Sequence, residues 1–134
     1  MNAPVYDMDG FDNSAVVREP HDRGRRVICY VTAADPLGYN RFIARLAHDR
    51  AMSVGLKNDL GQIPSLLTDL DLAVSEECAQ FHECHLLSAF VKAGKAVLHV
   101  EYKLRRERSC AETKALGFSS MRKRLPLGPW RQPC

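Results

Sequence analysis

Several features that would assign this 134-residue sequence to a class at once are missing from it. No stretch reaches the roughly 18 apolar residues that a membrane-spanning helix needs. The first residues lack the basic and then apolar segment of a secretory signal, so the sequence itself predicts no compartment. The formal net charge is only +3, which is weaker than the concentrated basic footprint of most nucleic-acid binders.

Internal repeats and low-complexity tracts are also lacking, and the composition is that of an ordinary globular chain. Hydrophobic residues make up 46% and charged residues 26%, a balance that argues against disorder. A chain of this length suits one compact domain, so we predict a single domain over residues 1–134.

Cysteine is present in an odd number, five, so complete pairing would leave one thiol over. The spacing favours a Cys78–Cys84 disulfide, with Cys110–Cys134 as a second candidate bridge and Cys29 as the buried free thiol. The sequence leaves this pairing undecided. A zinc site is the alternative interpretation of the segment from Cys78 to His85, which holds two cysteines and two histidines. The spacing of these residues matches no common zinc pattern.

Apolar periodicity predicts six short strands separated by helical stretches. The predicted strands are Val5–Phe11, Arg26–Thr32, Ser53–Asn58, Leu70–Glu77, Ala96–Tyr102 and Phe118–Arg122. Strands that alternate with helices through short links are typical of a parallel sheet covered by helices, so the predicted fold class is α/β.

Local signals predict where the helices begin and end. Asp35 followed by Pro36 predicts a helix start, Ser109 begins a predicted capping box, and Gly94 and Gly117 stand where helix-ending glycines belong. Pro20 falls inside another helical stretch, where it would disrupt the helix.

Two further expectations concern the first central helix and the end of the chain. The apolar side chains of the helix after Pro36 form one predicted stripe, made of Phe42, Ile43, Leu46 and Ala47. Residues 122–134 contain three prolines and are predicted to run as a loop or tail.

Alternate residues of a strand face the same side, so the apolar positions predict where the polar ones point. In a parallel barrel, large outward residues pack on helices, and polar inward residues near the strand ends point at the active-site mouth. Leu98 and Val100, for example, are predicted to face the helices, and Glu76 to point away from the mouth. The residues predicted to point inward are Asp7, Asp9, Tyr30, Lys57, Asp59, Glu77, His99 and Glu101.

Carboxylates gathered with a lysine and a tyrosine suit the cleavage of a glycosidic bond. One carboxylic acid protonates the leaving oxygen, while a second carboxylate attacks the sugar or activates water. An acid-rich site would also attract a cationic amino sugar. The alternative interpretation is that these are ordinary charges at strand ends, either paired or solvated.

A set of segments in this order resembles a known family, glycoside hydrolase family 114. The segments that carry the resemblance are Tyr6-Asp7-Met8-Asp9-Gly10-Phe11-Asp12, Arg26-Val27-Ile28-Cys29-Tyr30, Ser53-Val54-Gly55-Leu56-Lys57-Asn58-Asp59, Glu76-Glu77-Cys78 with Glu83-Cys84, His99-Val100-Glu101-Tyr102 and Ala115-Leu116-Gly117-Phe118-Ser119. The resemblance implies a (β/α)8 TIM barrel acting as an endo-α-1,4-polygalactosaminidase. It implies a retaining mechanism with two carboxylates and without a metal or organic cofactor.

The resemblance also implies roles for particular residues. A glutamate of the Glu-Glu-Cys segment would be the acid/base, and the strand alternation favours Glu77 over Glu76. The residues expected to contact substrate are Asp7, Asp9, Tyr30, Lys57, Asp59, Glu101 and Tyr102.

The chain departs from the family pattern in two places. It starts after the position of the family's first strand, and it has no Glu-Pro-Asp-Asn segment, whose aspartate would be the nucleophile. A complete barrel takes about 250 residues, so we expect an incomplete (β/α)8 barrel of about six parallel strands with flanking helices. The alternative to an active enzyme is therefore a carbohydrate-binding remnant without catalysis, or a fragment without function.

The expected partner is a galactosamine-containing polysaccharide, with neither nucleic acid nor a membrane. Open sheet edges would favour self-association. Two basic runs, within residues 105–108 and 122–124, are interpreted as a solvated face, with contact to polyanions as the alternative. Members of the family are expected to be secreted, whereas the compartment of this chain is not predicted.

Overall fold

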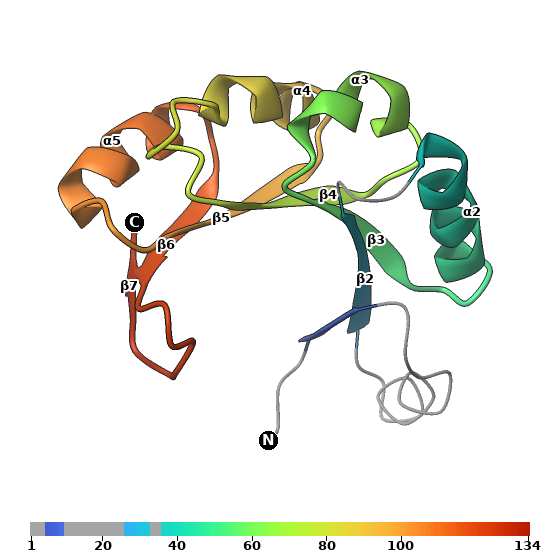
Figure 1. Cartoon of the computed structure of the whole chain (residues 1–134), viewed down its shortest axis with the longest axis horizontal. Helices are drawn as coiled ribbons and strands as arrows, with labels where there is room; N and C mark the ends of the chain where they lie inside the picture. Colours follow the sequence, from blue (N-terminus) through green and yellow to red (C-terminus); the bar gives the residue numbers. More distant parts are fainter. Residues whose placement is uncertain (1–4, 10–25, 33–35) are drawn as a thin grey trace. The chain divides into compact units, whose positions relative to one another are not determined.

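The computed structural model describes residues 5–9, 26–32 and 36–134 and divides into two compact units (Figure 1). Unit 1 comprises Met1–Asp71 and unit 2 comprises Leu72–Cys134. The predicted helix around Pro20 and the predicted cap at Asp35 lie outside the described residues. That the whole chain is one domain stays a prediction.

Unit 1 contains three strands that pair in parallel in chain order, β1 with β2 and β2 with β3. Helix α2 follows β2 in the chain and packs on both β2 and β3. The described elements of unit 1 are β1 (Val5–Asp9), β2 (Arg26–Thr32), α2 (Leu37–His48), β3 (Ser53–Lys57), the 3-10 turn η1 (Leu60–Gln62) and α3 (Ile63–Leu66).

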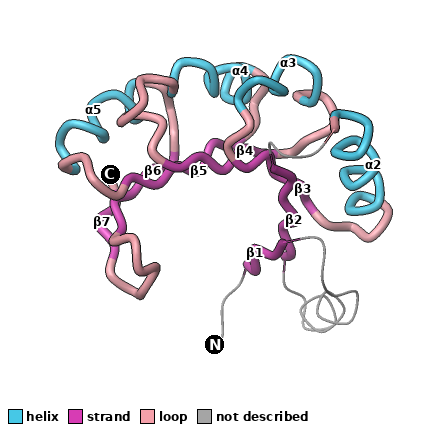
Figure 2. The backbone as a smooth tube through the Cα atoms, in the orientation of Figure 1, coloured by secondary structure: helices cyan, strands magenta, loops and turns pink. Residues whose placement is uncertain are grey.

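Unit 2 repeats the alternation of strand and helix. Strands β4, β5 and β6 pair in parallel, and β7 adds to β6 in the antiparallel direction. Figure 2 shows α4 and α5 on the same side of these strands. The elements are β4 (Leu72–Glu76), η2 (Cys84–Leu87), α4 (Ser88–Lys92), β5 (Ala96–Glu101), α5 (Arg106–Ala115), β6 (Ser119–Lys123) and β7 (Arg131–Pro133).

All six predicted strands are present, with boundaries within two residues of those expected. The prediction of a loop or tail over residues 122–134 is wrong, because β7 forms there and Gln132 pairs with Arg122. Three residues ending in Pro133 give no alternation to detect. The strand exists because β6 offers it a free edge and because the Cys134 N–H donates to the Ser120 carbonyl at 2.9 Å.

The predicted apolar stripe of α2 is wrong at Phe42, whose side chain is 54% exposed. The residues that α2 buries are Asn40, Ala44 and Ala47. Two alanines on the buried side let the helix backbone approach the strands closely, which the large side chain of Phe42 would prevent. Pro36 occupies the N-cap position, and no side chain caps this helix.

The predicted helix start at Ser109 is also wrong, because α5 begins at Arg106. Ser109 lies inside the helix, where its hydroxyl donates to the Arg106 carbonyl at 3.3 Å. The two helix-ending glycines are confirmed: Gly94 has φ 72° and Gly117 has φ 78°. Left-handed backbone of this kind favours glycine, since a side chain would be strained there.

Disulfides and core residues stabilise the two units. Both predicted bridges, Cys78–Cys84 and Cys110–Cys134, are present in unit 2, and Cys29 is the buried free thiol in unit 1. The core of unit 1 includes Val54, Leu56, Ile63, Leu66 and Leu70, and that of unit 2 includes Ala73, Leu87, Phe90, Val97 and Phe118. None of the helices in the described residues is long and apolar enough to cross a membrane.

Candidate active site

The end of β4 carries the two adjacent glutamates of the predicted site. Glu76 is the last residue of the strand and pairs in register with Val100 on β5. Tyr102 lies two residues beyond Val100 and therefore on the same face as Glu76. Its hydroxyl donates to Glu76 Oε1 at 2.6 Å, which ties the ends of β4 and β5 together.

Tyr102 is held in its neutral form by this contact. Burial, the hydrogen bond to Glu76 and the negative charges of Glu76 and Glu77 together raise the pKa of Tyr102 well above its ordinary value. The phenol consequently stays a hydrogen-bond donor at any physiological pH.

Glu77 leaves the strand in a different direction. Its φ is 60°, and its N–H donates to the Val100 carbonyl at 2.8 Å. Its Oε1 is buried and has no hydrogen-bond partner among the described residues, although Lys103 Nζ lies 3.8 Å away. Left-handed backbone at a non-glycine residue costs free energy and is common at functional sites.

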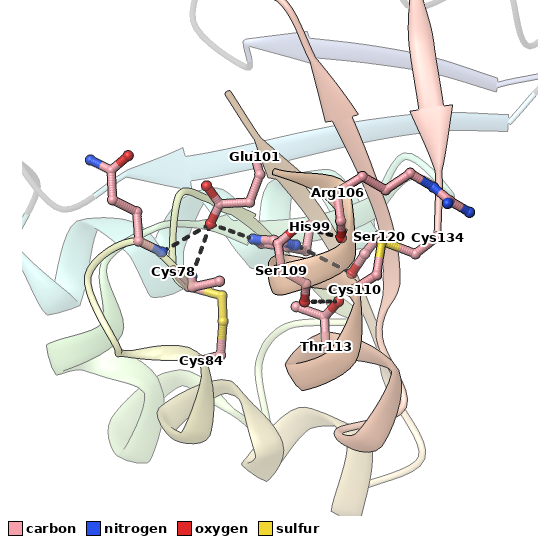
Figure 3. Close-up of polar contacts among 12 residues, drawn as sticks. Cys78, Cys84, His99, Glu101, Arg106, Ser109, Cys110, Thr113, Ser120 and Cys134 are labelled. Atoms are coloured by element: carbon pink, nitrogen blue, oxygen red, sulfur yellow. Dashed lines mark hydrogen bonds and ion pairs between the residues drawn. A yellow bond between two sulfur atoms is a disulfide. The ribbon is translucent and has the colours of Figure 1, made fainter. Parts of the chain in front are cut away.

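His99 and Glu101 occupy a buried polar cluster rather than an open mouth (Figure 3). Glu101 Oε1 accepts the backbone N–H groups of Ala79 at 3.0 Å and Gln80 at 3.1 Å, and it lies 3.3 Å from His99 Nε2. The other imidazole nitrogen, His99 Nδ1, lies 3.2 Å from the hydroxyl of Ser120. Glu101 thereby holds the start of the loop that follows Glu77 and that the Cys78–Cys84 disulfide closes.

The orientations predicted for β4 and β5 are therefore wrong. Glu76, expected to point away from the mouth, is in register with Val100, on the face opposite to the buried Ser75 and His99. Leu98, expected to pack on helices, is 36% exposed, whereas His99 is 1% and Glu101 0% exposed. Figure 3 shows both polar side chains on the side where the disulfide loop and α5 lie. The alternation of the strand was correct, but a buried hydrogen-bonded network has the same sequence pattern as a polar site open to solvent.

Unit 1 carries a second group of predicted site residues at the ends of β2 and β3. The Lys57 ammonium lies 5.8 Å from the centroid of the Tyr30 ring, as expected for residues on one face of neighbouring strands. Asp59 follows at φ 24°, and its Oδ2 is buried without a hydrogen-bond partner in the described part of the chain. Burial raises the pKa of Asp59, and a hydrogen bond from the Gln62 backbone partly opposes this.

The two aspartates of β1 can be placed only by register. Asp7 pairs with Ile28, and Asp9 pairs with Tyr30. The side chains of both aspartates lie outside the described residues.

The predicted site residues thus fall into two groups, one in each unit: Tyr30, Lys57 and Asp59 in unit 1, and Glu76, Glu77 and Tyr102 in unit 2. Sequence reasoning missed Lys103, although its position next to Tyr102, two residues after β5, was a usable signal. It also missed Ser120 as the partner of His99, and no local signal in the sequence pointed to that pairing.

Metal ligation finds little support in the part of the chain that the structure describes. One group of possible ligands there, Cys78, Cys84 and His99, has its ligand atoms within 4.8 Å of one another. Two of those atoms are the bonded sulfurs of the Cys78–Cys84 disulfide. A disulfide offers no thiolate, and thiolate is the form in which cysteine binds metals.

Comparison with known proteins gives two matches in agreement with this geometry. The model of glycoside-hydrolase family GH114 matches residues 31–134. The chain is also similar to the crystal structure of Aspergillus fumigatus Ega3 in complex with galactosamine, at 22% sequence identity and a TM-score of 0.69. That match covers 100% of this chain and 89% of the other. No curated protein sequence matches significantly.

The structural match confirms the predicted fold class, in which parallel strands alternate with helices as in an incomplete (β/α)8 barrel. The family match extends over most of the chain and includes the Glu-Glu-Cys, Gly-Leu-Lys-Asn-Asp and His-Val-Glu-Tyr segments. On this ground the chain belongs to glycoside-hydrolase family GH114.

Proposed function

We propose that this chain is a retaining glycosidase that cleaves α-1,4-linked galactosamine polysaccharide, with Glu77 as the acid/base. The observation that carries the proposal is the buried Oε1 of Glu77, which no protein donor engages. A general acid must come within about 2.6–3.2 Å of the oxygen that it protonates, so an uncommitted oxygen is the better candidate.

Glu76 fits that role less well, because its Oε1 already accepts the Tyr102 hydroxyl at 2.6 Å. Substrate could reach that oxygen only by breaking a short hydrogen bond to a carboxylate, which is among the stronger kinds in proteins. We assign Glu76 to holding Tyr102 and to attracting positive charge. Lys103, at 3.8 Å from Glu77 Oε1, would stabilise the carboxylate once the proton has been transferred.

The carboxylates of each group of predicted site residues agree with a cationic substrate. Carboxylates at Glu76 and Glu77 in unit 2 and at Asp59 in unit 1 would attract the amines of polygalactosamine. The crystal structure of Ega3 holds galactosamine, which makes an amino sugar the first ligand to test on this chain. We keep Asp7, Asp9, Tyr30, Lys57, Asp59 and Tyr102 as proposed substrate residues, and we reassign Glu101 to positioning the loop after Glu77.

A second candidate function is binding of the same polysaccharide without cleavage. A retaining glycosidase needs a second carboxylate as nucleophile. The absence of a Glu-Pro-Asp-Asn segment from the sequence favours this candidate. Another aspartate, Asp9 or Asp59, would have to replace the missing nucleophile for the chain to be active.

The test is release of reducing ends from de-N-acetylated galactosaminogalactan by the purified chain. We expect Glu77→Gln to lower the rate by about 10²- to 10⁴-fold, the usual contribution of a general acid/base. Glu83→Gln is the matched control, since Glu83 is an exposed glutamate of the same loop. An equal loss in both variants would contradict the assignment of Glu77.

Asp9→Asn and Asp59→Asn then identify the nucleophile by the same assay. Binding of the polysaccharide by the folded chain, measured together with no cleavage, would establish the second candidate. If the folded protein neither binds nor cleaves the polysaccharide, both candidate functions are wrong.

A further inference from the structure

The positive charge of this chain is concentrated in its last quarter. Residues 103–134 contain nine lysines and arginines and two acidic residues, a net charge of +7. Residues 1–102 therefore carry a net charge of −4. The proposed substrate residues belong to the acidic part, and of the basic residues only Lys103 has been given a role beside them.

The C-terminal hairpin, residues 119–133, combines this charge with exposed apolar side chains. Arg122 and Lys123 end its first strand, Arg124 follows directly, and Arg131 begins the second strand. The loop between them exposes Leu125 by 71% and Leu127 by 63%, the two most exposed large hydrophobic side chains among the described residues. Figure 1 shows this loop, between β6 and β7, reaching away from α4 and α5.

Contacts within the hairpin restrict the loop that carries Leu125 and Leu127. Trp130 stands at its base, with the guanidinium groups of Arg124 and Arg122 at 4.8 Å and 6.0 Å from its ring centroid. Within the loop, the Gly128 N–H donates to the Pro126 carbonyl at 2.5 Å. These contacts restrict the loop, and a restricted loop has less entropy to lose on docking.

The second strand is fixed to the body of unit 2 in two ways. Arg106 Nε donates to the Pro133 carbonyl at 2.8 Å. The Cys110–Cys134 disulfide joins helix α5 to the residue that follows β7. Docking by the hairpin would therefore hold unit 2 as a whole.

We propose that the C-terminal hairpin docks unit 2 on an anionic lipid surface, with Leu125 and Leu127 entering the interface and the surrounding basic side chains contacting the headgroups. Apolar residues flanked by basic ones are typical of segments that lie in the membrane interface. Clustered lysines and arginines are attracted to anionic leaflets. The expectation of no membrane partner rested on spanning segments and is revised by this surface.

Two other occupants fit the hairpin less well. A cationic galactosamine polymer would be repelled by its charge. A soluble polyanion would satisfy the four basic residues but would leave Leu125 and Leu127 in water. Charge and exposed leucines together therefore favour a lipid surface over either polymer.

The experiment is co-sedimentation of the full chain with vesicles of mixed phosphatidylcholine and phosphatidylserine, and with vesicles of phosphatidylcholine alone. We expect binding to the anionic vesicles alone, weakened by added salt. Leu125→Ser with Leu127→Ser should lower the partition coefficient by about tenfold or more. Phe42→Ser is the matched control, because Phe42 is similarly exposed but lies in unit 1.

The basic residues are tested by Lys123→Gln with Arg124→Gln, against Arg45→Gln with Lys92→Gln as a control of equal charge. We expect the hairpin pair alone to weaken vesicle binding, about tenfold. Circular dichroism establishes that each variant is folded. Equal binding by the leucine variant, binding to heparin with none to vesicles, or concentration-dependent self-association in place of vesicle binding would each overturn the proposal.

Discussion

Two glutamates of unit 2, Glu77 and Glu101, are surrounded in opposite ways. Glu101 is fully buried, and one of its oxygens accepts two backbone N–H groups and lies against an imidazole. Glu77 also has a buried oxygen, but no donor within hydrogen-bond distance serves it. Glu101 Oε2 is likewise buried without a hydrogen-bond partner in the described residues, so the two carboxylates differ in the donors that their Oε1 atoms receive.

The comparison teaches that burial alone does not separate a structural carboxylate from a functional one. Both glutamates lie at the end of a strand, and both were expected to point into a site. What separates them is the number of donors that the protein supplies, because unmade hydrogen bonds of a buried group cost free energy unless function uses them.

The largest expected difference between Glu77 and Glu101 appears when each carboxylate is removed in turn. Glu101→Leu leaves the N–H groups of Ala79 and Gln80 without an acceptor, so we expect a loss of about 3 kcal/mol in the free energy of unfolding. Glu77→Gln should change it by less than about 0.5 kcal/mol. Urea unfolding measures the free energy of unfolding of each variant. Glu101→Gln, which keeps a carbonyl acceptor, is the control. Equal losses at the two positions would end the distinction.

The disulfides test the structural role of Glu101 further, because the Cys78–Cys84 bridge closes the loop that Glu101 holds. Replacing both cysteines of Cys110–Cys134 by alanine should destabilise the chain by about 3 kcal/mol, and replacing those of Cys78–Cys84 by about 2 kcal/mol, since the shorter loop restricts the unfolded chain less. Thermal unfolding of the two variants shows which disulfide contributes more to stability.

Coupling between this bridge and Glu101 is a separate test. If Glu101 and Cys78–Cys84 hold one loop, the double change should cost less than the sum of the separate changes. Strict additivity would show that Glu101 acts elsewhere.

A smaller effect is expected at Tyr102, which belongs to the Glu77 side of the comparison. Tyr102→Phe removes the donor to Glu76 Oε1 and should cost about 1 kcal/mol. The pKa of Tyr102 is raised in the folded state, so its contribution is fully present below pH about 10 and is lost as the pH rises beyond that value. Phenolate absorbance of the folded chain should therefore be the same with and without Tyr102 near pH 10. A phenolate signal from Tyr102 at that pH would contradict the contact.

The smallest effect is expected in unit 1. Burial raises the pKa of Asp59, so its ionised form opposes folding at neutral pH. Asp59→Asn should stabilise the chain by less than about 0.5 kcal/mol at pH 7, because solvent screens a partly exposed carboxylate. The gain should vanish as the pH falls below the ordinary pKa of an aspartate. A variant that is less stable than the wild type at pH 7 would contradict this sign.

The sequence predicted the six parallel strands because alternation is a local signal, and it named both disulfides as candidates while leaving the pairing undecided. It did not predict β7, which depends on the free edge of β6, nor the true start of α5 at Arg106. Glu76, Glu77 and Tyr102 could be named from the sequence as candidate site residues, and their roles stay predictions. Which glutamate is engaged could not, because the hydroxyl that engages Glu76 lies 26 residues away along the chain.

The placement of the cysteines supplies a reporter that needs no engineering. Four of the five cysteines form the bridges of unit 2, which leaves Cys29 as the one thiol that a thiol-specific reagent can modify in the oxidised chain. Cys29 is 4% exposed on β2 in unit 1. Its labelling rate therefore measures how often unit 1 opens, independently of the covalently closed unit 2.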